Sequence, residues 1–424
     1  MSTTMKLAKE DINTPEKREK YTVSVVGCGR IGLQTACLFA EAGFKVIGVD
    51  PDQRIINLLK KGKSPFTEPQ LDALVKKYVK EGGFAATTDV RKVASASDII
   101  VFTVSTPVDK RKKPDYSYVE KACREVGIGL RSGSLIVFQS TVGPSITETL
   151  VKETLENASG LKAGIDFGLA YSPIPANPRQ ASKNLASHAR IVGAINQQSL
   201  EVACLVLSAV TKGEIVKVRD MRTAEAVNLF ESVYRDVHIA LANEFANFCE
   251  KTGIDFAEVQ KAANSNPHCY LTAPGIIGGH TPKNHYFLVE EAEAVNVKLP
   301  MLTLARKINE EVLDHTLHLA MDALRSCGKT MRRAKIAVFG VSSCPDVKEP
   351  HGSPTKKLVN MLRKRGALVQ VYDPFFSYKE LLKMGYPTKA TLTKSVEGVD
   401  CIIVAVRHDQ FRRLNLGRIK VLVK

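Results

Sequence analysis

Three glycines at the spacing G-x-G-x-x-G could bind the pyrophosphate of a dinucleotide: Gly27, Gly29 and Gly32. In such a motif the first glycine permits a tight turn, the second lets the backbone approach a phosphate, and the third lets a helix pack closely on a strand. Asp50 follows at the offset of about 20 residues that is expected for a carboxylate accepting hydrogen bonds from ribose hydroxyls. A 2′-phosphate would meet like charge there, so the pattern favours NAD over NADP, and only the nearby Arg54 argues weakly against this preference.

The segments around these residues have the periodicities of a β-turn-α-β unit. Thr22–Val26 is a β-branched run of strand length, and apolar residues recur at helical spacing after the glycines. A second strand, Lys45–Val49, ends directly before Asp50. The helix would begin at Arg30 and Ile31, whose free N–H groups and positive dipole end suit an anion. A glycine motif alone is a weak signal, but all these parts in one register predict an NAD site.

Polar residues follow two later predicted strands, at the edge where parallel sheets bind ligands. After Asp50, strands at 98–104 and 134–138 flank a helix at 119–130, which predicts a parallel doubly wound sheet. Thr106 follows the first of these strands and Thr141 the second, so we expect both to line the cofactor cleft. Hydroxyls at strand ends also cap helices, and the pattern leaves both interpretations open.

The middle of the chain predicts one long helix and the end predicts a second sheet. Residues 223–252 repeat apolar side chains at helical spacing without Pro or Gly. A helix of that length usually joins two domains or pairs with a second subunit. A glycine-rich loop at 273–280 and more helix follow. From Lys335 the strand-turn-helix pattern restarts, but the turn after Phe339 lacks G-x-G-x-x-G and is not expected to bind a dinucleotide.

The predicted fold class is therefore α/β: an N-terminal Rossmann doubly wound parallel sheet, a long central helix and a smaller C-terminal Rossmann-like α/β domain. The expected boundaries are a polar N-terminal tail at 1–20, a NAD-binding Rossmann domain at 21–215, a central helical and dimerisation region at 216–328, and a C-terminal α/β domain at 329–424.

Composition excludes several classes of protein. The chain has 60 Lys and Arg against 44 Asp and Glu, a formal net charge of +16, but the basic residues are scattered without aromatic neighbours. We therefore expect an anionic substrate rather than nucleic acid. Nine cysteines without C-x-x-C fit a reducing cytoplasm, and the absence of a long apolar run predicts no membrane span. His268, Cys269, His280 and His285 crowd one segment, but their spacing matches no zinc motif, so no metal is predicted.

Motifs along nearly the whole chain from residue 21 resemble those of one family. They are VVGCGRIGLQTACLFAEAGFKVIGVD, VSTPVDKRKKPDYSYV, QSTV, AEAVNLFESVYRDVHIALANEFA, APGIIGGH, and GVSSCPDVKEPHGSPTKKL with VYDP after it. Together they resemble the NAD-dependent nucleotide-sugar 6-dehydrogenases, the UDP-glucose/GDP-mannose dehydrogenase family. YSPIPANPRQ followed by RIVG is similar to the S-P-E-R-x-x-P-G segment of the UDP-N-acetylmannosamine branch.

The resemblance implies a reaction, a homodimer built on the long helix, and a substrate, the nucleotide sugar, that binds to the C-terminal domain at 329–424. In that family two hydride transfers to NAD turn a primary alcohol of a UDP-sugar into an acid, and a cysteine thiolate traps the intermediate aldehyde. The resulting thioester is hydrolysed while a lysine and an asparagine stabilise the oxyanion. The family's G-G-H segment falls on Gly278, Gly279 and His280, and an arginine that contacts the nucleotide sugar falls on His351.

Most of the family's reacting residues are replaced here. The cysteine falls on Thr281 and the following aspartate on Asn284, while the lysine and asparagine of the long helix fall on Asn228 and Ser232. A threonine hydroxyl is a far poorer nucleophile than a thiolate. Further exchanges place neutral residues where the family has charged ones or, in one case, a histidine where it has proline. These exchanges are at Ile174 (family glutamate), His285 (proline), Cys344 (lysine) and His351 (arginine).

Three functions stay open at this point. One is the ordinary four-electron oxidation of a UDP-sugar, most like UDP-N-acetylmannosamine, and another is a two-electron oxidation that stops at an aldehyde or ketone. The third is a non-catalytic NAD-binding paralogue that regulates an active homologue. Cys269 lies twelve residues before Thr281 and could replace the missing thiol, but a free cysteine is more often a small buried hydrophobe.

Overall fold

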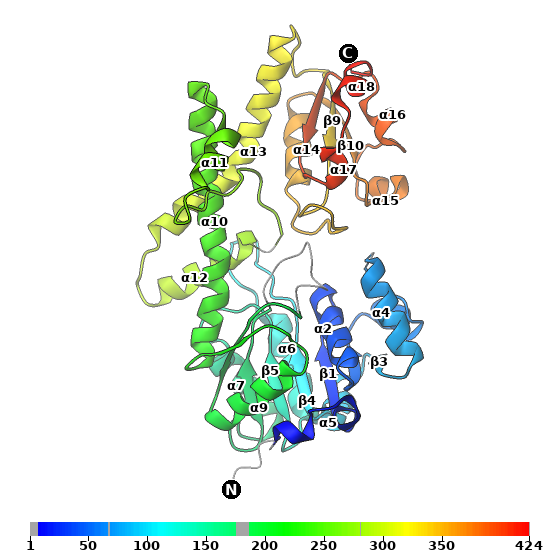
Figure 1. Cartoon of the computed structure of the whole chain (residues 1–424), viewed down its shortest axis with the longest axis vertical. Helices are drawn as coiled ribbons and strands as arrows, with labels where there is room; N and C mark the ends of the chain where they lie inside the picture. The colour runs from blue at the N-terminus through cyan, green and yellow to red at the C-terminus, as the bar shows by residue number, and fades with distance from the viewer. Residues whose placement is uncertain (1–6, 67, 175–185, 280, 424) are drawn as a thin grey trace. The chain divides into compact units, whose positions relative to one another are not determined.

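The structure is a computed structural model that describes residues 7–66, 68–174, 186–279 and 281–423. The described residues form two compact units. Unit 1 lies within Met1–Glu231 and Tyr286–Lys298, and unit 2 within Ser232–His285 and Leu299–Lys424. Two helices run from one unit into the other, α10 (Met221–Thr252) and α12 (Thr281–Ala294). Figure 1 labels the elements in chain order.

Unit 1 is built on an eight-stranded sheet with the order β3-β2-β1-β4-β5-β6-β7-β8. The strands are β1 Thr22–Val26, β2 Lys45–Val49, β3 Phe84–Thr87, β4 Ile99–Phe102, β5 Leu135–Phe138, β6 Gly168–Tyr171, β7 Arg190–Ala194 and β8 Ile215–Lys217. Every neighbouring pair is parallel except β6 and β7, which pair antiparallel. This order, in which the chain reverses direction across the sheet at β1, confirms the predicted doubly wound Rossmann sheet.

Helices cover both faces of this sheet, which explains why β4, β5 and β6 are buried over their whole length. The helical segments of unit 1 are η1 Lys9–Asp11, α1 Pro15–Arg18, α2 Arg30–Glu41, α3 Gln53–Lys60, α4 Pro69–Lys80, α5 Val90–Ala96, α6 Ser117–Gly129, η2 Thr147–Val151, α7 Lys152–Ser159 and α9 Gln197–Ser208. All four residues of β4 are buried because its alternate side chains enter two separate cores. Within the predicted polar tail, Leu7 and Ile12 are buried in one of these cores.

Unit 2 contains a smaller sheet of three parallel strands in the order β10-β9-β11. Its elements are α11 Phe256–Ala263, α13 Pro300–Ser326, β9 Lys335–Phe339, α14 Thr355–Lys364, β10 Leu368–Tyr372, α15 Tyr378–Lys383, α16 Leu392–Val396, β11 Cys401–Val404, α17 Asp409–Arg412 and α18 Leu416–Lys420. Apolar residues of α13 and α14, such as Leu317 and Leu358, pack on one face of the sheet, and Val396 and Phe411 pack on the other. The predicted C-terminal α/β domain is thereby confirmed.

The first turn after the leading strand has the same geometry in both sheets. Gly27 and Gly340 have positive φ angles of 99° and 95°, a region that favours glycine. The N–H of each donates to the last residue of the neighbouring strand, to the Val49 carbonyl and to the Tyr372 carbonyl, both at 2.8 Å. The two sheets are therefore built alike at this turn, although only the first has the dinucleotide motif.

The predicted long helix is present as α10, which continues without a break over 32 residues (Figure 1). Its inward side chains, among them Leu229, Val233 and Ala240, are buried. Among the described residues, no helix is both long and apolar enough to cross a membrane.

Candidate functional site

The glycines of the motif lie where a bound pyrophosphate would require them. A Cβ atom on Gly27 would come within 2.9 Å of the Thr103 carbonyl oxygen, and one on Gly32 would overlap the carbonyl oxygen of Gly27. Both positions therefore exclude larger residues for packing reasons. At Gly29 a Cβ would meet nothing within 4 Å, so open space faces the backbone there. Gly29 also precedes α2 and has no side chain to cap its first N–H groups, which leaves them for an anion.

Asp50 is fixed beside this turn by two backbone hydrogen bonds. Its Oδ2 atom accepts from the Cys28 N–H at 2.9 Å and its Oδ1 atom accepts from the Asp52 N–H at 2.9 Å. Each carboxylate oxygen keeps a further lone pair for a ribose hydroxyl. Arg54 binds Asp52, with Nη2 and Oδ2 2.8 Å apart, and its hydrogen bonds lower the pKa of Asp52 to about 2. Because Arg54 already pairs with an acid, the preference for NAD over NADP stands.

Arg30 and Ile31, the first residues of α2, follow Gly29 as predicted. The Arg30 guanidinium forms an ion pair with Glu68 at 2.8 Å and lies 5.8 Å from the centre of the Phe66 ring. Its side chain therefore binds a neighbouring segment of unit 1, and only its backbone N–H is placed by the helix for an anion.

The two predicted threonines meet at the carboxyl edge of the large sheet. The Thr106 hydroxyl donates to the Thr141 carbonyl at 2.7 Å. Nearby, Gln139 is buried at the end of β5, yet in the described part of the chain neither polar atom of its amide has a hydrogen-bond partner. Buried amides normally have partners, so this unpaired group fits a site for a polar ligand. Together with the glycine turn and Asp50, the residues present fit a bound NAD.

Asn228 lies at the same edge of unit 1. Its Nδ2 atom donates to the Thr141 hydroxyl at 3.4 Å and to the Tyr171 hydroxyl at 3.5 Å, and its side chain is buried. Burial raises the pKa of Tyr171 well above its ordinary value, so this phenol is neutral. The structure thus brings Asn228 and Thr141 together, but every group in this small cluster is uncharged.

Glu225 is a buried acid beside this cluster that sequence reasoning missed. It is fully buried, and its two oxygens accept from the Ser145 N–H at 2.6 Å and the Thr147 N–H at 2.8 Å. Burial raises its pKa to about 7, although these hydrogen bonds act in the opposite direction. An acid three residues before Asn228, flanked by Ala224 and Ala226 near the start of α10, was the only available signal.

In unit 2 the structure brings Asn284 and Ser232 together. The Asn284 Nδ2 atom donates to the Ser232 hydroxyl at 3.1 Å, and the Asn284 side chain is 3% exposed. Thr281 begins α12, but its side chain and all of His280 lie outside the described residues. Lys283, which sequence reasoning missed, is a further candidate in the same helical turn, because burial lowers its pKa to about 8.

Gly278 and Gly279 contact the loop that joins β9 to α14. The Gly279 N–H donates to the Gly352 carbonyl at 3.1 Å, and a Cβ on Gly278 would come within 2.8 Å of the Ser343 carbonyl oxygen. This β9–α14 loop, residues 340–354, also carries His351, whose exposed ring has its Nδ1 atom 2.7 Å from Glu349. Three of the four predicted substrate residues are thus close in unit 2, and His280 is the one outside the described residues.

A buried polar network fixes the start of the glycine-rich loop. The Arg306 Nη1 atom donates to Asp236 at 2.5 Å, and Asn309 donates to the same carboxylate at 3.0 Å. Asn243 donates to Asn309 at 2.9 Å and accepts from the Gly275 N–H at 2.7 Å. Burial raises the pKa of Asp236, although Arg306 lowers it. This chain of contacts joins α10 and α13 to the loop that leads to Thr281.

The segment with histidines and a cysteine shows no metal site. Among the described residues, no three His, Cys, Asp or Glu side chains form a group that could hold a metal ion. Cys269 is exposed, so the expectation of a small buried hydrophobe is wrong for this residue. The reason is local, because Cys269 lies in a turn after α11, where its N–H donates to the Asn266 carbonyl.

Comparison with known proteins identifies the family. The UDP-glucose/GDP-mannose dehydrogenase family matches the chain with its NAD binding domain at residues 21–210, its central domain at 222–311 and its UDP binding domain at 337–424. The chain belongs to this family. The NAD binding domain that the family match places at 21–210 contains the glycine turn and Asp50, which confirms the predicted cofactor.

Several relatives of the family are similar over most of their length. UDP-N-acetyl-D-mannosamine dehydrogenase from Pyrococcus horikoshii is 33% identical over 93% of this chain and 91% of its own. The same-named protein of Methanococcus maripaludis is 34% identical over 94% and 90%. Among solved structures, UDP-D-ManNAc dehydrogenase from Pyrococcus horikoshii has a TM-score of 0.87 at 32% identity, covering 95% of this chain and 93% of its own. These matches confirm the predicted fold and the predicted membership of a family of NAD-dependent UDP-sugar dehydrogenases.

Proposed function

We propose that this chain binds NAD and a UDP-sugar similar to UDP-N-acetylmannosamine, and that it does not oxidise the sugar through a thioester. The proposal rests on a contrast between two sets of residues. The glycine turn expected to bind the cofactor is intact, but the positions of the family's reacting side chains carry uncharged residues. Gly29 faces open space beside a fixed Asp50, whereas Asn228 and Asn284 bind only hydroxyl groups. When bound, NAD would accept a hydride from the sugar.

The cofactor would be held by residues of unit 1. The N–H groups at the start of α2 would bind the pyrophosphate and the Asp50 carboxylate would accept from the ribose hydroxyls. Thr106, Thr141 and the Gln139 amide would meet the polar end of the cofactor at the sheet edge. The substrate assignment is supported by the match to a UDP binding domain and by the relatives' names.

The reacting groups support at most a two-electron oxidation. Removing a hydride and a proton from a primary alcohol gives an aldehyde, and the family then needs a thiolate to prepare the second hydride transfer. Position 281 is a threonine, and the lysine and asparagine that stabilise the oxyanion in the family are replaced by Asn228 and Ser232. Such stabilising groups are each worth on the order of 3 kcal/mol, by comparison with a lost oxyanion-hole donor. The loss of two would slow turnover by roughly four orders of magnitude.

The stoichiometry of NADH tests this proposal. Purified protein is incubated with NAD and a panel of UDP-sugars, and NADH formed per sugar consumed is measured together with the product mass. One NADH and an aldehyde or ketone select the two-electron enzyme, and NAD binding without turnover selects the non-catalytic paralogue. Rapid formation of a uronate with two NADH would refute the proposal. The Thr281→Cys variant serves as control, since a thiol without the missing charged partners should restore little activity.

We propose further that the chain forms a homodimer through α10. Large side chains at spacings of seven, four and three residues are exposed along one stripe of this helix: Tyr234, Leu241, Phe245 and Phe248, with Tyr234 at 60% and Phe248 at 61%. The same stripe on the α10 helix of a second chain would bury these apolar side chains in a dimer interface. Light scattering should show a dimer at micromolar concentration. Phe248→Glu should shift it to monomer, while Tyr118→Glu, at an equally exposed position on α6, should not.

A cytoplasmic location completes the proposal. Nine cysteines are all free of disulfide bonds, as expected in a reducing compartment. Cell fractionation would test this, and recovery of the protein from an oxidising compartment would contradict it.

A further inference from the structure

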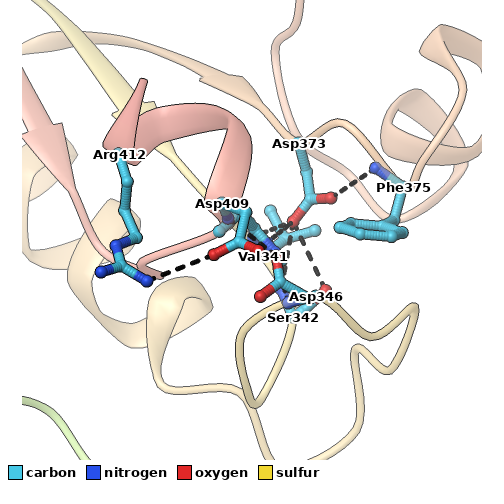
Figure 2. A network of polar contacts seen from close by, with 8 residues as sticks. Val341, Ser342, Asp346, Asp373, Phe375, Asp409 and Arg412 are labelled. Atoms are coloured by element: carbon cyan, nitrogen blue, oxygen red, sulfur yellow. Dashed lines mark hydrogen bonds and ion pairs between the residues drawn. The ribbon is translucent and has the colours of Figure 1, made fainter. Parts of the chain in front are cut away.

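A buried histidine, His408, forms a hydrogen bond with the backbone of the β9–α14 loop. His408 precedes α17 and is fully buried, as is Asp373 at the end of β10. The His408 Nε2 atom lies 3.1 Å from Asp373 Oδ2, and the Asp346 N–H donates to His408 Nδ1 at 2.8 Å. Asp346 belongs to the loop itself. Figure 2 shows Asp346 and Asp373 together with Val341 and Ser342, which lie at the start of the loop.

The hydrogen-bond directions determine the form of this histidine. A backbone N–H can only donate, so the Nδ1 atom of His408 must accept the bond from Asp346. The ring is therefore neutral and carries its proton on Nε2, which donates to Asp373. The same Asp373 oxygen also accepts from the Val341 N–H at 2.7 Å. One neutral imidazole thus links a strand-end carboxylate to the middle of the loop.

The loop needs such anchors because its conformation is strained. Asp346 has a φ angle of 62°, in the left-handed region that side chains other than glycine seldom adopt. Its carboxylate accepts from the Asp409 N–H at 2.8 Å, and its own N–H is the group bound to His408. Lys348 adds a third anchor through its ion pair with Glu380 at 2.6 Å. Without the bond to His408, the strained residue would relax and shift the loop.

Asp50 and Asp373, which follow equivalent strands in the two sheets, differ in their hydrogen-bond donors. In unit 1, Asp50 accepts from the N–H groups of Cys28 and Asp52. In unit 2, Asp373 accepts from the matching N–H groups, those of Val341 and Phe375, the latter at 2.9 Å (Figure 2). Asp373 has the additional donor His408, whereas no histidine hydrogen bond to Asp50 is present among the described residues. This carboxylate therefore braces a loop instead of binding a dinucleotide.

The loop held in this way contacts the residues proposed for the nucleotide sugar. Gly352 and Ser343 of the loop pack against Gly279 and Gly278, and His351 belongs to the same loop. A displacement of the loop would therefore move two glycines close to Thr281 as well. The whole loop lies within the matched UDP binding domain.

We propose that His408 is a positioning residue for nucleotide-sugar binding, acting through its Nδ1 bond to the Asp346 N–H. The inference rests on the proposed function, because it assigns the loop to the UDP-sugar. His408 does not touch the ligand in this role. It keeps the β9–α14 loop packed on the glycine-rich loop, so that the nucleotide meets a preformed site.

Three variants separate the two hydrogen bonds of His408. In His408→Asn the side-chain oxygen takes the place of Nδ1 and keeps the bond to Asp346, but the donor to Asp373 is lost. In His408→Gln the amide NH₂ takes the place of Nε2 and keeps the bond to Asp373, but the acceptor for Asp346 is lost. His408→Phe loses both and keeps the ring packing against Phe375 and Phe411. Gln370→Met on β10, which removes the hydrogen bond to the Ser395 carbonyl of α16, is the stability control.

UDP binding by calorimetry gives the first result. We expect His408→Gln and His408→Phe to reduce the affinity for UDP by about tenfold, which is the effect of one lost buried hydrogen bond. The affinities of His408→Asn and Gln370→Met should stay within about threefold of that of the parent. Weak binding by His408→Asn with normal binding by His408→Gln would overturn the proposal, because the Asp373 bond would then be the important one. Equal binding by all four variants would overturn it too.

Hydrogen exchange without added nucleotide gives the second result. Peptides covering 341–353 and 275–279 should both exchange faster in His408→Gln and His408→Phe than in the parent, and unchanged exchange at 275–279 would refute the coupling of the two loops. This measurement also separates two kinds of failure. If the parent binds no UDP, the proposed function fails on its own, while the exchange data still decide whether His408 holds the loops together.

Discussion

Replacing Glu225 by glutamine tests how burial sets the charge of an acid beside the cofactor edge. Glu225 is fully buried and accepts hydrogen bonds from two backbone N–H groups, yet burial raises its pKa from the ordinary 4.5 to about 7. A glutamine has nearly the same shape and no titration. The comparison of the two proteins therefore isolates the proton of Glu225 from all other titrating groups.

The magnitude follows from the difference between the two pKa values. From 4.5 to about 7, at 1.36 kcal/mol for each pH unit, the difference corresponds to about 3 kcal/mol. The sign follows from proton binding, because the folded protein keeps this proton up to a higher pH than the unfolded chain. The stabilisation is fully present below pH 4.5 and is lost as the pH rises to about 7.

Urea unfolding measures this loss. Far-UV circular dichroism is the suitable signal, since the chain has no tryptophan. Between about pH 4.5 and about pH 7.5 the parent should lose about 3 kcal/mol of unfolding free energy relative to Glu225→Gln, in the transition that unfolds unit 1. A difference between the two proteins that does not change with pH would show that the Ser145 and Thr147 N–H groups keep Glu225 ionised, which would refute the reasoning.

Three further results are expected. Gly29→Ala should fold like the parent, because open space faces Gly29, but its NAD affinity by calorimetry should fall by about tenfold or more. Gly32→Ala should fold poorly, because its Cβ would overlap the Gly27 carbonyl oxygen. NAD should bind more tightly than NADP, and Asp50→Asn should reduce the ratio of the two affinities. Equal affinities in the parent would contradict the proposal that Asp50 disfavours a 2′-phosphate. Arg306→Met should destabilise the protein by about 3–5 kcal/mol in urea, because the buried Asp236 carboxylate loses its cation, and adding Asp236→Asn should recover most of this stability.

The cofactor turn could be predicted because its determinants are close together in the chain. Gly27 and Asp50 are separated by a single strand-turn-helix-strand unit, whose periodicities and glycines encode its geometry locally. The long helix was predictable for the same reason, since a Pro-free and Gly-free run at helical spacing needs no knowledge of distant residues. The resemblance to the dehydrogenase family rested on several such local motifs.

Other parts of the candidate site depend on contacts between distant segments. Nothing near Asn228 in the sequence indicates that it meets Thr141, because the sheet edge and α10 come from separate parts of the chain. Lys283 and Glu225 look like ordinary surface charges in the sequence, and only their burial changes their pKa values. The exposure of Cys269 was likewise mispredicted, since exposure depends on what packs against a residue.

By itself, then, the sequence predicted the α/β architecture, an NAD-binding domain and the replacement of the family's reacting residues, because residue types and short-range spacing are local properties. The tertiary structure alone decided which carboxylates are buried and what faces them. Asp50 and Asp373 end equivalent strands and accept equivalent backbone hydrogen bonds, but only Asp373 is met by a histidine from a segment 35 residues away. Because that contact joins segments far apart in the sequence, only the tertiary structure distinguishes Asp373 from Asp50, which we propose as a ligand of the cofactor ribose.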